Sequence, residues 1–262
     1  MGAARENAIE IRDVWKNYAP GTDFALRGIT LTVAREDFVA LTGASGAGKT
    51  TLLKLINRLS EPSRGSILVA GEDVSLAEPV RLRRSIGYVF QRVGLFPHLT
   101  VAENIGITPR LLNWQKNQIA ARVDEMLDLV RLPRGLKDRL PGSLSGGQAQ
   151  RVGVARALAA RPSIVLMDEP FGAVDPITRD ALARDYRALH EALKLTTIMV
   201  SHDIMEAILM ADRIAVLDAG ELIEYGATGD LIRNARSPAV RHLMQMPLQQ
   251  AERVHHLATG AA

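Results

Sequence analysis

Residues 38–50 read FVALTGASGAGKT, an apolar run that enters a glycine-rich loop and ends on a lysine and a threonine. The apolar run predicts a buried strand, and the helical spacing of apolar residues over 52–59 predicts a helix directly after the loop. Pro62 and Gly65 end that helix. This strand–loop–helix order indicates an α/β fold, because it is the setting in which a glycine-rich loop binds phosphate.

The loop matches the pattern G-x-x-x-x-G-K-[ST]. Glycines let successive N–H groups turn toward an anion, and the positive end of the following helix favours the same charge. Lys49 would reach the β- and γ-phosphates of a nucleotide, and the Thr50 hydroxyl would ligate Mg²⁺. A glycine-rich turn without a ligand is the alternative, which the flanking strand and helix disfavour. The predicted nucleotide-binding residues of the loop are Gly43, Ser45, Gly46, Gly48, Lys49, Thr50 and Thr51.

Asp168 and Glu169 follow a second apolar run at residues 163–167, which is typical of a strand covered on both faces. Buried carboxylates are costly without a partner, and the strand ends of a parallel sheet open into a ligand crevice. We therefore predict that Asp168 holds Mg²⁺ beside Thr50 and that Glu169 poises water for attack on a phosphoryl group. The alternative is a capping pair for the following turn.

The rest of the chain predicts more strands and an inserted helical region. Strands are expected at residues 9–14, 29–33, 66–69, 86–90, 196–200, 213–217 and 222–225. Residues 100–161 carry helical spacing instead, broken by Pro133 and Pro162, and we interpret them as a helical subdomain inserted between strands. After Gly226 the chain first looks helical and then loses its pattern.

The composition excludes several kinds of site. The 262 residues are 47% hydrophobic and 23% charged, with a net charge of +3 and no long run of like charges, so a nucleic-acid-binding tail is not indicated. Without cysteine there is no disulfide or thiolate metal site. No apolar run reaches the ~18 residues of a membrane-spanning helix and no signal sequence is visible, so we expect a chain that is cytosolic or lies on the cytosolic face of a membrane. His255 and His256 lie in a polar tail and are expected to be solvated.

Residues 144–148, LSGGQ, resemble the signature of the ATP-binding subunits of ABC (ATP-binding cassette) transporters and precede Asp168 at the spacing of that family. Ser145 can cap a helix whose N–H groups face an anion. One chain rarely folds two phosphate-binding helix ends onto one nucleotide, so the resemblance implies a head-to-tail homodimer. Each ATP·Mg²⁺ would lie between the loop of one copy and Ser145, Gly146, Gly147 and Gln148 of the other.

Three further strings resemble the family in order, and the resemblance covers about residues 9–232. Gln91 resembles the glutamine that touches Mg²⁺ and water, and His202 resembles the switch histidine at the γ-phosphate. Residues 172–175 resemble the D-loop, which adds Asp175 to the nucleotide site. The resemblance implies that Lys49, Gln91, Glu169 and His202 are catalytic and that Thr50, Gln91 and Asp168 bind the metal. Tyr18 resembles the aromatic that stacks on adenine, with Trp15 as a competitor.

The fold implied is a P-loop NTPase core with a mixed β-sheet, an N-terminal antiparallel β subdomain and an inserted α-helical subdomain at about 92–161. The ATPase domain would span 1–232, followed by a tail at 233–262 without the regulatory CBS pair of many relatives. In the family, residues 92–104 lie in the groove that receives a coupling helix of a membrane subunit. Phe96, Pro97 and Leu99 either supply apolar contacts there or pack the subdomain.

Several strings resemble importer ATPases for quaternary-ammonium osmoprotectants such as glycine betaine. They are INRL at 56–59 with EP at 61–62, LRR at 82–84 with IGY at 86–88, GLFPH at 94–98, LL at 111–112 with Trp114, and DPITR at 175–179. This implies a peripheral subunit on the cytoplasmic face of the cell (inner) membrane, working with permease subunits and a solute-binding protein and without nucleic acid. The alternatives are another small solute such as an amino acid, a soluble non-transport ABC ATPase, and a non-catalytic binding module. Glu169 and His202 argue against the last.

Overall fold

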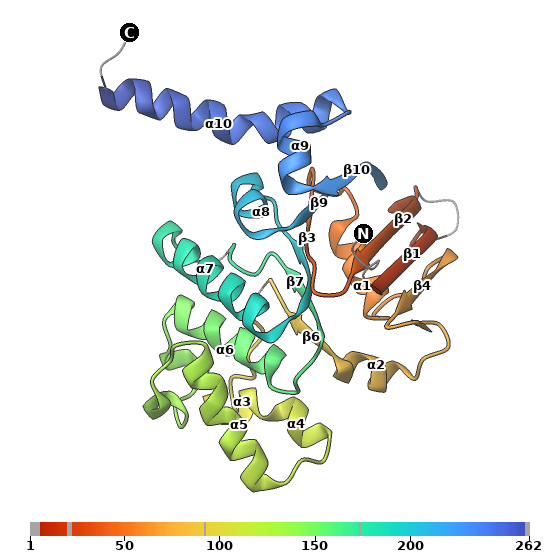
Figure 1. The fold of residues 1–262 in the computed structure, drawn as a ribbon. Coiled ribbons are helices and arrows are strands. Elements are labelled where there is room, and N and C mark those ends of the chain that lie inside the picture. Colours follow the sequence, from red (N-terminus) through yellow and green to blue (C-terminus); the bar gives the residue numbers. More distant parts are fainter. Residues whose placement is uncertain (1–5, 20–22, 92, 173, 260–262) are drawn as a thin grey trace.

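The computed structural model describes residues 6–19, 23–91, 93–172 and 174–259, except the side chains of 254–256, 258 and 259. Arg92 and Ala173, as well as the side chains of His255 and His256, therefore lie outside the described residues. The described chain forms two sheets with helices around them (Figure 1). The N-terminal sheet is antiparallel, in the order β2 (Leu26–Ala34), β1 (Asn7–Lys16), β4 (Arg64–Val69) and β5 (Glu72–Asp73).

The second sheet places the ends of four parallel strands beside one another. Its order is β10 (Glu221–Ala227), β9 (Arg213–Asp218), β3 (Phe38–Thr42), β8 (Thr196–Val200), β7 (Ile164–Asp168) and β6 (Ile86–Val89). Strands β9, β3, β8, β7 and β6 of this sheet run parallel, and β10 pairs antiparallel with β9 at its edge. The segments that follow β3, β6, β7 and β8 therefore emerge at one edge of the sheet.

The central strands are buried on both faces, which explains their continuous apolar sequences. In β3, Phe38 and Ala40 join the core under the helical side, whereas Val39 and Leu41 join the core that faces the antiparallel sheet. Helix α1 (Lys49–Ile56) lies between the two sheets, where its leucines are buried (Figure 1). The loop before α1 is thus held by two packed elements.

Helices fill the chain between β6 and β7, as predicted. These helices are α3 (Val101–Ile105), α4 (Ile107–Leu111), α5 (Lys116–Leu129) and α6 (Gly146–Leu158), with 3₁₀ turns at Arg134–Leu136 and Pro141–Ser143. A further helix, α2 (Pro79–Ser85), precedes β6. Helices α7 (Pro176–Leu193) and α8 (Ile204–Met210) follow β7 and β8. The mixed sheet, the N-terminal antiparallel sheet and the inserted helices confirm the predicted fold class.

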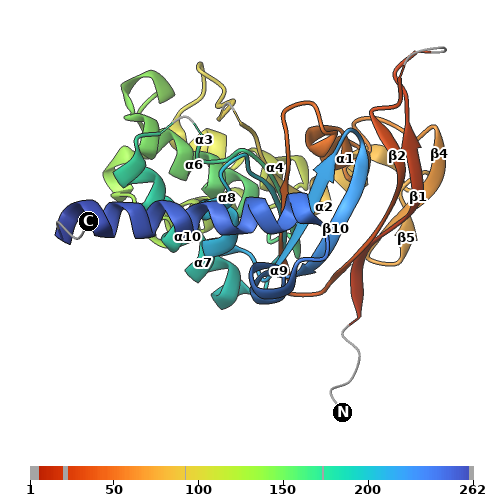
Figure 2. The same cartoon turned by 90° about the horizontal axis from the view of Figure 1, so that it is seen from above.

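Two predicted boundaries differ from the structure. Helix α1 ends at Ile56 rather than near Leu59, because Arg58 takes a left-handed conformation with φ of 48°. The prediction that the tail loses its pattern is wrong, since α9 (Thr228–Asn234) and α10 (Pro238–Thr259) continue the chain. Helix α10 buries Val240 and Met244, contacts α8 and α9, and extends past them (Figure 2). The predicted division after residue 232 falls inside α9. In the described part of the chain, no helix is long and apolar enough to cross a membrane.

Candidate functional site

The loop between β3 and α1 has a backbone that only glycine can adopt at its two ends. Gly43 has φ of +136°, and a Cβ atom there would lie 1.9 Å from the carbonyl oxygen of Leu217 in β9. Gly48 has φ of +93°, and a Cβ atom there would lie 2.5 Å from the carbonyl oxygen of Ala25, just before β2. The glycines therefore let the loop lie against backbone of both sheets.

Lys49 lies buried under this loop. Its Nζ donates to the carbonyl oxygens of Gly43 and Ala44 over 2.7 and 2.8 Å. Burial lowers the pKa of Lys49, and the nearby carboxylates of Glu169 and Asp168 oppose that shift. The ammonium group is therefore held beneath the loop by backbone oxygens, where an incoming phosphate can replace them as the partner.

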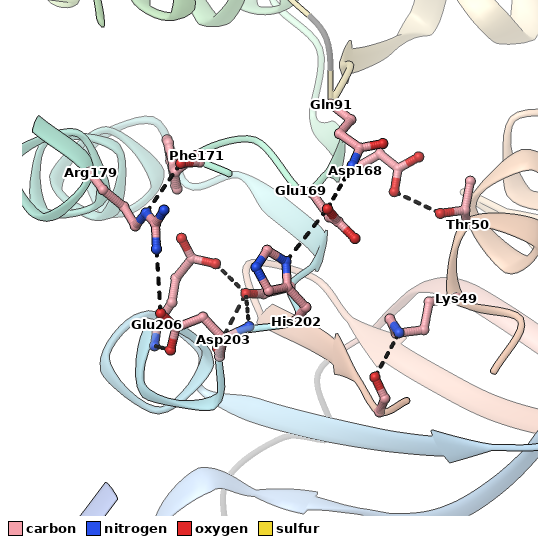
Figure 3. Close-up of polar contacts among 12 residues, drawn as sticks. Lys49, Thr50, Gln91, Asp168, Glu169, Phe171, Arg179, His202, Asp203 and Glu206 are labelled. Atoms are coloured by element: carbon pink, nitrogen blue, oxygen red, sulfur yellow. Dashed lines mark hydrogen bonds and ion pairs between the residues drawn. The ribbon is translucent and has the colours of Figure 1, made fainter. Parts of the chain in front are cut away.

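Thr50 and Asp168 join α1 to the end of β7. The Thr50 Oγ1 donates to the Asp168 Oδ1 over 2.9 Å (Figure 3). Burial raises the pKa of Asp168, and the hydrogen bond from Thr50 acts in the opposite direction. A hydroxyl and a carboxylate, with the Gln91 amide nearby, form an oxygen-only donor set that fits Mg²⁺. The described residues contain no group of three or more His, Cys, Asp or Glu that could hold a metal. A Mg²⁺ bound together with a nucleotide does not need such a group, because phosphate oxygens and water supply most of its ligands.

Glu169 brings the ends of three strands together. Its Oε2 accepts a hydrogen bond of 2.7 Å from the Gln91 Nε2 and lies 3.5 Å from the His202 Nδ1 (Figure 3). The residue has φ of 45°, and its N–H donates over 3.0 Å to Val200 at the end of β8. Glu169 is thus fixed between β7 and β8, with its carboxylate directed at Gln91 and His202, two of the three other predicted catalytic side chains.

These groups surround one cleft of about 580 Å³. The residues that line it are Ala25, Ser45, Gly46, Ala47, Gly48, Lys49, Thr50, Thr51, Gln91, Glu169 and His202. Asp168 lies beside them through its bond to Thr50, and Gly43 forms the base of the loop. Ala25 was not predicted, because a small residue just ahead of a strand carries no sequence signal.

Tyr18, rather than Trp15, reaches the loop. The Tyr18 hydroxyl is 3.0 Å from the Thr51 Oγ1, and the residue is 63% exposed. The Trp15 ring packs edge-on against Phe24 at 5.3 Å, and its Nε1 donates to Asp13. The Lys16 ammonium lies 5.2 Å from the centre of the Tyr18 ring, and Tyr18 is otherwise exposed beside the phosphate loop (residues 43–50), whereas Trp15 is packed against another ring.

The residues 145–148 and Asp175 do not line the cleft of their own chain. Ser145 caps α6: its Oγ accepts from the Gln148 N–H at 3.2 Å, while the Gln148 Oε1 accepts from the Ser145 N–H at 3.0 Å. Asp175 caps α7 by accepting from the Thr178 N–H at 3.0 Å, and its bonds to Thr178 lower its pKa. A Cβ at Gly147 would lie 2.7 Å from the Thr178 side chain, so the two caps are neighbours.

Comparison with known proteins identifies related chains. A family model described as "ABC transporter" matches residues 26–172. The choline transport ATP-binding protein OpuBA of Bacillus subtilis is 45% identical over 255 residues, which cover 95% of this chain and 67% of the relative. The glycine betaine/carnitine/choline transport ATP-binding protein OpuCA of the same organism is 46% identical over 236 residues, covering 90% and 62%. The chain thus spans about two thirds of the length of these relatives.

A solved structure supports the same relationship. It is the dimeric post-hydrolysis state of the ATP-binding cassette MJ0796 bound to ADP and Pi. Its TM-score to this chain is 0.76 at 32% sequence identity, over 84% of this chain and 98% of that one.

Proposed function

Because the chain belongs to the ABC transporter family, we propose that it hydrolyses ATP in the cleft formed by the phosphate loop and the ends of β6, β7 and β8. The observation that carries the proposal is the Glu169 carboxylate, which faces this cleft and is held between Gln91 and His202. A carboxylate so placed can accept a proton from water that attacks the terminal phosphate.

The other side chains have separate roles in this proposal. Lys49 leaves its two carbonyl partners and binds the β- and γ-phosphates, while the loop N–H groups bind the remaining oxygens. Gln91 and His202 orient Glu169 and the water. Thr50, Asp168 and Gln91 would hold Mg²⁺, which would neutralise charge on the phosphate oxygens. Tyr18 would stack on the adenine.

The complete site requires a second copy of the chain. Ser145 to Gln148 present the N-terminal end of α6, a place that favours phosphate, yet they lie outside the cleft of their own chain. In a head-to-tail homodimer each copy supplies this end, with Asp175 beside it, to the ATP of the other. The dimeric state of the MJ0796 cassette supports this arrangement.

We further propose that the subunit powers import of a quaternary-ammonium osmoprotectant such as glycine betaine, through permease subunits and with a solute-binding protein. It would lie at the cytoplasmic face of the membrane. The transported solutes named for OpuBA and OpuCA support this class of cargo. Residues 93–104 remain the proposed contact with the permease, where Phe96 is 41% exposed.

Phosphate release by the purified chain tests the catalytic proposal. We expect Mg²⁺-dependent hydrolysis by the wild type, and Lys49→Ala should weaken nucleotide binding by about tenfold or more, because a charged hydrogen bond to phosphate is lost. An unchanged dissociation constant for ATP contradicts the role of Lys49, and absence of hydrolysis contradicts the proposed function. The cargo is tested by uptake of labelled glycine betaine in a strain that lacks the gene for this chain. Uptake at the level of the parent strain points to another solute.

A further inference from the structure

Arg179 connects the two segments that carry Glu169 and His202. It lies in the first turn of α7, and its guanidinium reaches backward over the chain that enters this helix (Figure 3). Its Nε donates to the carbonyl oxygen of Phe171 over 3.2 Å, and its Nη2 donates to that of Val174 over 3.4 Å. The five N–H groups of arginine can bind several acceptors at fixed angles, which fits these contacts.

The same guanidinium pairs with the residue after His202. The Arg179 Nη1 lies 3.6 Å from the Asp203 Oδ2, which makes an ion pair (Figure 3). Asp203 is itself fixed, because its Oδ1 accepts from the N–H groups of Met205 and Glu206 at the start of α8. Arg179 therefore links α7 to the beginning of α8.

The contacts on the other side lead directly to Glu169. The Gly172 N–H donates to the carbonyl oxygen of Glu169 over 3.2 Å, so Phe171 belongs to a tight turn that begins at Glu169. A Cβ atom on Gly172 would lie 3.8 Å from the His202 Cε1, which shows how closely this turn approaches the histidine. A shift of the turn would therefore move Glu169 relative to His202.

The half-buried carboxyl of Glu206 lies beside this link, and its negative form is stabilised by a positive charge nearby. Glu206 accepts a hydrogen bond from the Ser201 hydroxyl, and burial raises its pKa while Arg179 acts in the opposite direction. Glu169, Gly172, Arg179, Ser201, His202, Asp203 and Glu206 all border one small space. Arg179 does not line the nucleotide cleft, so its influence on ATP must pass through other residues.

We infer that Arg179 is a positioning residue, whose contacts with the 171–174 segment and Asp203 hold Glu169 and His202 in the geometry needed for hydrolysis. This inference rests on the proposed ATPase function. Loss of the guanidinium should misplace the carboxylate and the imidazole while it leaves the phosphate loop and Tyr18 intact. The effect should therefore appear in kcat and not in nucleotide binding.

The first experiment compares Arg179→Met and Arg179→Lys with Arg184→Met. Arg184 is the matched control, because it lies on the same helix, is 72% exposed and pairs with the exposed Asp180. We expect Arg179→Met to lower kcat by about 10- to 100-fold with KM for ATP changed less than about threefold. Arg179→Lys should restore part of the loss, since one charge remains without the planar fork. Arg184→Met should behave as wild type.

The second experiment separates positioning from general destabilisation. In a His202→Ala background, Arg179→Met and Arg179→Lys should each lower kcat by a smaller factor than in the wild-type background, because the part of the effect that passes through His202 is already lost. Losses equal to those in the wild-type background, or an unchanged kcat in the single variants, would overturn the inference. If Arg179→Met does not fold, the Arg179→Lys cycle decides alone. If the wild type hydrolyses ATP and both Arg179 variants do so with the same kcat, this inference is refuted while the proposed function stands.

Discussion

Gln91, which follows β6, donates from its Nε2 to the Oε2 of Glu169, at the end of β7, over 2.7 Å. The two residues are distant in sequence, yet the parallel pairing of β6 with β7 brings them to one edge of the sheet. The bond fixes one carboxylate oxygen, while His202 lies 3.5 Å from the same atom. Contacts within the chain thus orient Glu169, as is needed for a group that must act at one position in a reaction.

Glu169→Gln should retain ATP binding and lose most hydrolysis. The amide keeps the shape and an oxygen for Gln91, but it cannot accept a proton from water, and general base catalysis is worth about 10²–10⁴-fold. We expect phosphate release to fall by at least about 100-fold, an unchanged dissociation constant for ATP, and accumulation of an ATP-bound dimer in size-exclusion chromatography. Glu252→Gln, on the exposed face of α10, is the control. Normal steady-state turnover in Glu169→Gln would refute the base role.

Ser145→Ala should lower ATPase activity far more than stability. As a helix cap alone, Ser145 is worth about 1 kcal/mol of unfolding free energy, because its Oγ satisfies one N–H at the start of α6. As a phosphate contact across the dimer, its loss should lower activity by about tenfold or more. Glu78→Ala removes another cap, on α2, and provides the control. Equal effects of both substitutions on activity and on thermal unfolding would leave Ser145 with a capping role only.

The strands and the phosphate loop could be predicted because their signals are local. The runs at β3, β7 and β8 are mostly apolar, since both faces are buried. The glycine spacing of the loop reflects positions such as Gly43 that have no room for a side chain. The proximity of Asp168 to Thr50 followed from strand order. The nucleotide-binding and catalytic assignments themselves stay predictions.

The features that could not be predicted depend on contacts between distant segments or on unusual backbone geometry. The end of α1 was placed too late because Leu59 continues the apolar spacing. The helix instead ends with hydrogen bonds from the Leu59 N–H to the Lys54 carbonyl oxygen and from the Arg58 N–H to the Leu55 carbonyl oxygen. Arg58 takes the left-handed conformation that glycine usually supplies at the end of a helix. The sequence did not indicate that Arg179 pairs with Asp203, because the two residues approach each other only when α8 packs beside α7.

Gly43→Ala should destabilise the folded protein much more than Gly46→Ala. Both glycines have positive φ, so each alanine carries a backbone cost of about 1–3 kcal/mol. Only at Gly43 would the new Cβ lie 1.9 Å from a backbone oxygen, that of Leu217, whereas nothing lies within 4 Å at Gly46. We expect thermal unfolding without nucleotide to show a modest decrease for Gly46→Ala and a decrease at least about twice as large for Gly43→Ala. Equal decreases would mean that the loop can leave β9 without penalty.

Asp168→Asn should stabilise the nucleotide-free protein while it impairs catalysis. Burial raises the folded-state pKa of Asp168 above its ordinary value of 3.8, so the folded state binds more protons than the unfolded state between these two values. The free energy of unfolding therefore falls as pH rises through that window, and the deficit is complete above the folded-state pKa. The asparagine has no charge to desolvate and can still accept from Thr50, so it removes this deficit.

Thermal unfolding in EDTA, without nucleotide, tests the sign of this effect. The midpoint of Asp168→Asn should exceed that of the wild type near pH 7, by roughly 2–4 °C for each kcal/mol gained, and the difference should shrink toward pH 4. Asp180→Asn, at an exposed carboxylate on α7, should show no such gain. Mg²⁺-dependent hydrolysis should fall in Asp168→Asn, because an amide is a weaker ligand for a divalent cation. A midpoint for Asp168→Asn below that of the wild type near pH 7 would mean that the Asp168 charge stabilises the fold. Metal binding would then not be needed to explain a buried carboxylate at the end of β7.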